Sequence, residues 1–130
     1  MGDYSSYLEK EISEQPFYLQ NAINGRIIKS KPEIKLSGIR DYIQDILSAD
    51  EVVFVGCGTA FYAAKIAAHA MENIGRIRSR AINAGELQYF NPIITDKTIL
   101  IAISQSGETA DTIGCIEFYK GRASKVIGVT

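Results

Sequence analysis

The stretch Val52-Val53-Phe54-Val55-Gly56-Cys57-Gly58 decides the fold class. Its first four residues are all apolar, so they would place apolar side chains on both faces of a strand. This pattern suits a parallel strand that helices cover on both sides. The glycine-rich turn leads directly into an alanine-rich helical stretch at 60–74, and Gly75 is well placed to end that helix. The stretch therefore predicts the first strand and first crossover helix of an α/β domain.

The same order of elements is repeated downstream. Strand-like segments follow at 77–82, 98–103 and 125–129, and helical segments at 83–92 and 108–119 lie between them. Alternation of this kind predicts a parallel sheet with right-handed crossovers and helices on both faces. In such sheets ligands bind beyond the carboxyl ends of the strands.

The first 48 residues have a different character. Two amphipathic helices are predicted there, at 4–24 and 36–47, and Pro16 is expected to end or restart the first of them. We therefore divide the chain of 130 residues into a helical lead-in, residues 1–48, and a ligand-binding α/β domain, residues 49–130.

Composition narrows the classes of function. The net charge of −1 offers no basic stripe for nucleic acid. The apolar runs are too short to span a bilayer, and no charged-then-apolar leader opens the chain. Cys57 and Cys115 have no spacing typical of a metal or redox site. We expect a cytoplasmic protein with reduced thiols that binds no metal, membrane or nucleic acid.

The strongest candidate site follows the strand at 98–103. Ser104, Gln105, Ser106 and Thr109 bring three hydroxyls and one amide into a loop, in which Gly107 permits a close backbone approach. The loop enters a helix N-terminus, where unpaired N–H groups favour an anion. Such a site would bind phosphate through hydroxyls and the helix dipole, because the loop contains no lysine or arginine. Serine, glycine and threonine are also common in any strand-to-helix turn.

The loop after Val55 begins like a dinucleotide fingerprint but departs from it. Phe61 stands where the third glycine belongs, and Asn83 stands where an acidic residue is expected after the second strand. We therefore predict no cofactor, and we expect Thr59 to add a hydroxyl to a pocket shared with the second loop. His69 is assigned to the polar side of its helix, as a surface or interface residue.

At these residues the chain resembles a known family. The run Ser104-Gln105-Ser106-Gly107-Glu108-Thr109-Ala110-Asp111-Thr112 is similar to the phosphate-binding signature of the sugar isomerase (SIS) fold. More narrowly, it resembles the isomerase domain of the glutamine–fructose-6-phosphate aminotransferases. Three further segments agree with that narrower resemblance: Lys10–Pro16, Gly25–Ile27 and Cys57–Thr59. The resemblance implies a three-layer α-β-α sandwich with a parallel, flavodoxin-like sheet.

The resemblance also implies a ligand and the residues that hold it. Fructose 6-phosphate or glucosamine 6-phosphate would bind through its phosphate to Ser104, Gln105, Ser106 and Thr109, with Thr59 and position 60 joining from the first loop. The family usually has serine at that position, and Ala60 removes one hydroxyl donor.

Departures from the family limit the expected activity. The family's glutaminase domain starts with a cysteine nucleophile, whereas this chain starts Met1-Gly2-Asp3. The glutamate base, the imine-forming lysine and the ring-opening histidine of the family come from sequence beyond the equivalent of Thr130. We therefore assign no catalytic residue. The sheet is expected to be truncated after its fourth strand, so that the chain pairs with itself as a homodimer or with a missing C-terminal half.

Two other functions stay open. The chain could be a subunit or fragment of an SIS sugar-phosphate deaminase or isomerase that lacks the glutaminase domain. It could instead be a non-enzymatic sugar-phosphate sensor, although the first 48 residues lack the basic charge of a DNA-binding module.

Overall fold

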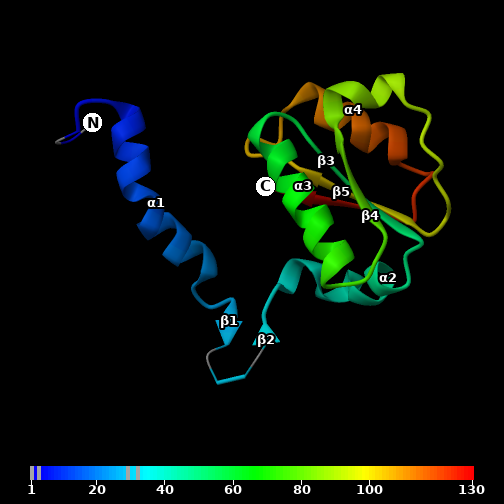
Figure 1. Ribbon diagram of the computed structural model, residues 1–130, viewed down its shortest axis with the longest axis horizontal. Coiled ribbons are helices and arrows are strands. Elements are labelled where there is room, and N and C mark those ends of the chain that lie inside the picture. The colour runs from blue at the N-terminus through cyan, green and yellow to red at the C-terminus, as the bar shows by residue number, and fades with distance from the viewer. Residues whose placement is uncertain (1, 3, 29, 32) are drawn as a thin grey trace. The chain divides into compact units, whose positions relative to one another are not determined.

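A computed structural model describes residues 2, 4–28, 30–31 and 33–130 (Figure 1). The chain forms two compact units, Met1–Asp41 and Tyr42–Thr130, and each is described by itself. No helix among the described residues is both long and apolar enough to cross a membrane.

The first unit contains a helix and a small hairpin. Helix α1 (Tyr7–Ile23) begins at Ser6, whose side chain accepts a hydrogen bond from the backbone N–H of Glu9 at 3.1 Å. Strands β1 (Ile27–Ile28) and β2 (Glu33–Ile34) pair antiparallel after it. A 3₁₀ helix, η1 (Ser37–Tyr42), follows the hairpin.

Pro16 does not interrupt the first helix, so the predicted break there is wrong. Pro16 lies inside α1, and none of the residues of α1 is buried. Proline removes the N–H that would bond the carbonyl four residues earlier. On an exposed helix that carbonyl can bond to water, which makes the missing hydrogen bond tolerable.

The second unit is built on a parallel sheet, as predicted. Its strands are β3 (Glu51–Gly56), β4 (Ser79–Asn83), β5 (Thr98–Ile103) and β6 (Lys125–Val129). Their order in the sheet is β4-β3-β5-β6, and every neighbouring pair is parallel. The connections are α3 (Thr59–Asn73), the 3₁₀ helix η2 (Ala84–Tyr89) and α4 (Ala110–Tyr119).

Helices cover both faces of this sheet, so the predicted α-β-α architecture is confirmed (Figure 1). Val53 and Val55 of β3 belong to a buried cluster that includes Cys115 and Tyr119 of α4. Because successive strand residues point to opposite faces, Val52 and Phe54 face the other side, where α3 packs against β3 and β4. Both faces of β3 are therefore buried, as its continuous apolar run predicted.

Two helical predictions need correction. The predicted helix at 36–47 is the 3₁₀ helix η1 followed by a short α-helix, α2 (Ile43–Leu47), in which only Ile46 is buried. The short helix after β4 is also 3₁₀, although Asn83 caps it as predicted by accepting from the N–H of Gly85 at 3.2 Å. Segments this short make few intrahelical hydrogen bonds, and 3₁₀ geometry is common in pieces of this length.

Candidate functional site

The two predicted loops leave neighbouring strands at the same edge of the sheet. β3 ends at Gly56 and β5 ends at Ile103, and these strands are paired in register, with Val55 opposite Ala102. A Cβ atom on Gly56 would lie 2.9 Å from the carbonyl carbon of Ala60 and 3.1 Å from the carbonyl oxygen of Ile103. The start of α3 and the end of β5 therefore pack closely around a position where only glycine fits.

The loop after β5 is shaped by its own serines. The backbone N–H of Gly107 donates to Oγ of Ser104 at 3.0 Å, and the N–H of Glu108 donates to Oγ of Ser106 at 3.2 Å. Gly107 has a φ of +72°, in the left-handed region that favours glycine. Both serine oxygens accept these bonds, which leaves each hydroxyl hydrogen free to rotate towards a further acceptor; for Ser104 that acceptor can be Thr109 Oγ1.

Burial separates the loop residues into two groups. Ser104 is only 8% exposed and its N–H donates to the carbonyl of Val129 at 3.0 Å, so it anchors the loop to β6. Oγ1 of the half-buried Thr109 lies 3.4 Å from Oγ of Ser104. Gln105 and Ser106 are exposed to solvent. Ser104 and Thr109 thus hold the loop in place, while Gln105 and Ser106 present their polar side chains to solvent.

The loop leads into an uncapped helix N-terminus. Thr109 is the N-cap residue of α4, and its side chain makes no capping hydrogen bond. The first intrahelical bond runs from the N–H of Ile113 to the carbonyl of Thr109. The N–H groups of the first helical turn, which precede Ile113, are therefore not used inside the helix. Together with the helix dipole they favour a negatively charged group.

The first loop contributes a second helix start. Gly58 is the N-cap residue of α3, with a φ of +55° and no capping side chain. Thr59 is exposed and Ala60 is half-buried. Thr59 makes no side-chain hydrogen bond within the described part of the chain, so the structure does not link it directly to the serines of the second loop.

A feature missed from the sequence lies beside α4. The carboxylate Oδ2 of Asp111 is 4.0 Å from Sγ of Cys57, and a cavity of about 280 Å³ is lined by residues of η2 and α4, Asp111 among them. Burial first, and then the nearby Cys57 and Asp111, raise the pKa of Cys115 to about 11. Cys115 therefore stays a neutral thiol at physiological pH. No spacing in the sequence indicated this group, because Cys57 and Asp111 lie on different elements.

The remaining candidates stand apart from the loops. His69 is exposed on α3, as predicted, and its ring lies within hydrogen-bond distance of the Asn73 amide. Among the described residues, no group of three or more His, Cys, Asp or Glu side chains could hold a metal ion.

Comparison with known proteins places this geometry in a family. A profile of the SIS domain matches residues 45–130. Glutamine–fructose-6-phosphate aminotransferase (isomerizing) of Bacteroides thetaiotaomicron is 38% identical over 128 residues, which make up 98% of this chain and 21% of that protein. The same enzyme of Clostridium acetobutylicum is 39% identical over 129 residues, 99% of this chain and 21% of that protein. The chain therefore spans about a fifth of the length of these relatives.

Solved structures agree with the sequence comparison. The C-terminal domain of glucosamine-fructose-6-phosphate aminotransferase from Francisella tularensis superposes with a TM-score of 0.83 at 26% identity, covering 98% of this chain and 35% of that chain. Tagatose-6-phosphate ketose/aldose isomerase from Escherichia coli shares the fold, with a TM-score of 0.65 at 16% identity over 95% of this chain and 34% of its own. The chain belongs to the SIS domain family, and it is homologous to the isomerase domain of the glutamine–fructose-6-phosphate aminotransferases.

Proposed function

We propose that the chain binds a hexose 6-phosphate, fructose 6-phosphate or glucosamine 6-phosphate, through its phosphate group. The observation that carries this proposal is the loop at the uncapped N-terminus of α4, whose backbone is held by hydrogen bonds to the side chains of Ser104 and Ser106. Backbone N–H groups of the first turn of α4 would contact the phosphate, and hydroxyls from both loops would complete the site. We assign the ligand contacts to six positions: Thr59, Ala60, Ser104, Gln105, Ser106 and Thr109.

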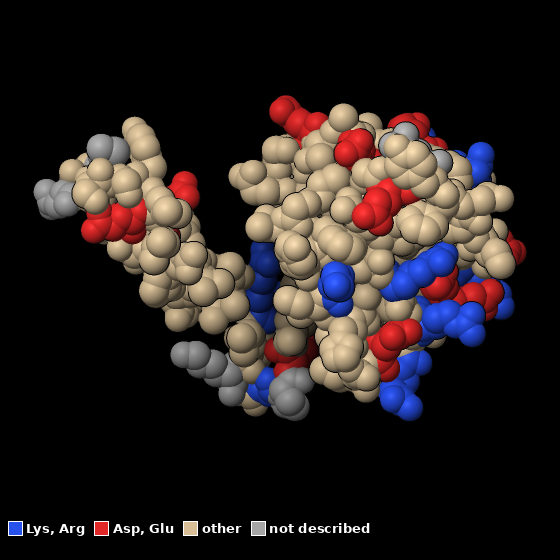
Figure 2. Space-filling view, turned by 45° about the horizontal axis from the view of Figure 1, so that its top comes forward, with Lys and Arg blue, Asp and Glu red and all other residues tan. Residues whose placement is uncertain are grey.

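The charge distribution supports a phosphate bound mainly by neutral donors. The loop from Ser104 to Thr109 contains no lysine or arginine. Figure 2 shows basic and acidic side chains intermingled on the face of the domain in view. Hydrogen bonds to a charged group are each worth about 1.5–3 kcal/mol. Three or four of them together reach the binding free energy of about 4 kcal/mol that a Kd of about 1 mM requires.

Calorimetric titration with glucosamine 6-phosphate and fructose 6-phosphate tests the proposal. We expect saturable heat for the unchanged chain, and loss of about tenfold in affinity for Ser106→Ala, which removes an exposed hydroxyl. The double variant Ser104→Ala and Thr109→Val should abolish binding. Ser124→Ala, a serine outside the loops, is the matched control. Absence of heat at millimolar ligand would refute the proposal for this chain.

Position 60 offers a sharper test of the same site. If the family's usual serine contributes a hydroxyl there, Ala60→Ser should tighten binding of the hexose phosphate by a few-fold to about tenfold. Unchanged affinity in this variant, with Ser106→Ala still weakened, would remove position 60 from the site and leave the phosphate loop in place.

The wider role rests on the family. We propose that residues 49–130 form the sugar-phosphate-binding unit of an aminotransferase- or isomerase-type enzyme in amino-sugar metabolism, with residues 1–48 as its helical lead-in. Catalytic groups would come from the sequence or subunit with which this unit associates. A cytoplasmic location fits this role, because it keeps Cys57 and Cys115 reduced.

A further inference from the structure

A polar cavity lies at the opposite end of the sheet from the phosphate loop. It has a volume of about 510 Å³ and opens where β3 and β5 begin, at Glu51 and Thr98. Its polar lining consists of two arginines, two carboxylates and two threonines: Arg78, Arg80, Asp50, Glu51, Thr95 and Thr98. The proposed sugar-phosphate site uses none of these residues.

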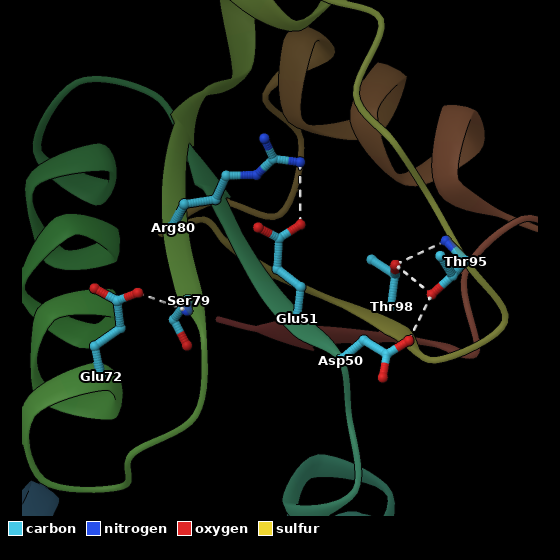
Figure 3. Close-up of polar contacts among 7 residues, drawn as sticks. All are labelled: Asp50, Glu51, Glu72, Ser79, Arg80, Thr95 and Thr98. Carbon is cyan, nitrogen blue, oxygen red and sulfur yellow. Dashed lines mark hydrogen bonds and ion pairs between the residues drawn. The ribbon is translucent and has the colours of Figure 1, made fainter.

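One pair of charges in this cavity is already neutralised. The guanidinium of Arg80, on β4, lies 3.1 Å from Oε2 of Glu51, on β3. In Figure 3 Glu51 stands between Arg80 on one side and the threonines on the other. The backbone N–H of Thr95 donates to Oγ1 of Thr98 at 2.9 Å, which orders the threonine side of the cavity.

The other two charges are left without a partner of opposite sign. Arg78 and Asp50 form no ion pair with any residue that the structure describes. Asp50 is contacted only weakly, by Oγ1 of Thr95 at 3.5 Å (Figure 3). Within the described part of the chain, the cavity therefore holds one cation and one anion that have no ion-pair partner. A simple anion would be repelled by the two carboxylates, and a simple cation would be repelled by the two guanidinium groups. A zwitterion can place its negative group at Arg78 and its positive group at Asp50.

A cavity with a mixed lining adjoins the polar one. It has a volume of about 440 Å³ and shares Arg80 and Ile93 with the polar cavity. Phe90 and Pro92 belong to its apolar wall, and Glu86 and Asn91 also line it. Ile93 is 83% exposed and Phe90 54% exposed, so this wall is open to a ligand. A ligand with charged groups at one end and an apolar tail at the other would match both cavities.

We propose that the paired cavities bind a small zwitterion of the α-amino acid class with an apolar side chain. Its carboxylate contacts Arg78, its ammonium group contacts Asp50, and its side chain lies against Phe90 and Ile93. The site is separate from the hexose phosphate site, because the two lie at opposite ends of the strands.

Three ligands of nearly equal shape test the charge requirement. L-Leucine carries both charges, L-leucinamide lacks the carboxylate, and 4-methylpentanoate lacks the ammonium group. Titration into the ¹⁵N-labelled full chain should give saturable shifts of the backbone amides of Glu51, Thr95 and Thr98 with L-leucine. The two analogues should bind at least about tenfold more weakly, since each loses one charge-assisted contact. Equal binding of all three, or no saturable shift up to about 50 mM L-leucine, would overturn the proposal.

Variants locate the contacts and separate the two sites. Arg78→Gln and Asp50→Asn should each weaken L-leucine at least about tenfold, whereas Arg122→Gln, an exposed arginine outside the cavities, should not. The same spectra report whether each variant is folded. The double variant Ser104→Ala and Thr109→Val should keep L-leucine binding whatever happens to its hexose phosphate binding. Full affinity in Arg78→Gln would contradict the assignment.

Discussion

Gly56, at the end of β3, shows how a single residue determines the distance between the two loops. A Cβ atom there would lie 2.9 Å from the carbonyl carbon of Ala60, closer than real Cβ contacts allow. Because both neighbours are backbone atoms, Gly56→Ala should lower the free energy of unfolding by about 1–3 kcal/mol. Gly114→Ala is the matched control: it lies within α4 with nothing within 4 Å, and should raise stability by up to about 1 kcal/mol. Urea unfolding measures both, and equal effects would contradict the close packing at Gly56.

The two thiols should differ strongly in reactivity. Cys115 is 1% exposed, and burial above all raises its pKa to about 11. Because the pKa of this acid is higher in the folded than in the unfolded state, the stability it contributes is complete below about pH 9 and is lost as the pH rises towards 11. At pH 8 we expect iodoacetamide to modify Cys57 and to spare Cys115 until urea unfolds the chain, as mass spectrometry can count. Cys57→Ser should abolish fast labelling, and rapid modification of Cys115 in the folded chain would contradict its burial.

At the scale of elements, α1 offers a test of proline in an exposed helix. Proline in a helix interior costs about 3 kcal/mol relative to alanine. Since α1 continues through Pro16 without burying a residue, its helicity has little packing to support it. Pro16→Ala should therefore increase the ellipticity at 222 nm, and Gln15→Ala, a neighbouring solvent-exposed position, should change it much less. Equal changes in ellipticity for the two variants would contradict the prediction, because they would mean that contacts and not intrinsic helix propensity determine the helicity of α1.

Elements with a strong sequence signal were predictable, and those shaped by distant contacts were not. The apolar runs of β3 and β5 predicted strands buried on both faces, and the polar loops after them were expected at one edge of the sheet. The break at Pro16 failed because exposure to water, which the local pattern does not encode, decides its cost. No pattern in the sequence singled out Arg78 and Arg80, because their place in a cavity depends on pairing between β4 and β3. Likewise, the Cys57–Asp111 contact joins residues 54 positions apart.

At the scale of the whole molecule, the two edges of the sheet differ in how they resist association. Both edge strands carry one basic residue that is paired with a carboxylate, Arg80 with Glu51 on β4 and Lys125 with Asp45 on β6, so the difference lies in their apolar side chains. Among the residues that the structure describes, β6 pairs with β5 alone, and Val126 and Val129 on it are exposed. We therefore predict that the chain associates through β6, and that sedimentation shows twice the monomer mass at micromolar concentration. Val126→Lys should restore the monomer, since a lysine on an edge strand blocks strand pairing. Ile66→Lys places the same charge on the exposed face of α3 and should leave the dimer intact; loss of the dimer in that variant alone would place the interface on α3 instead.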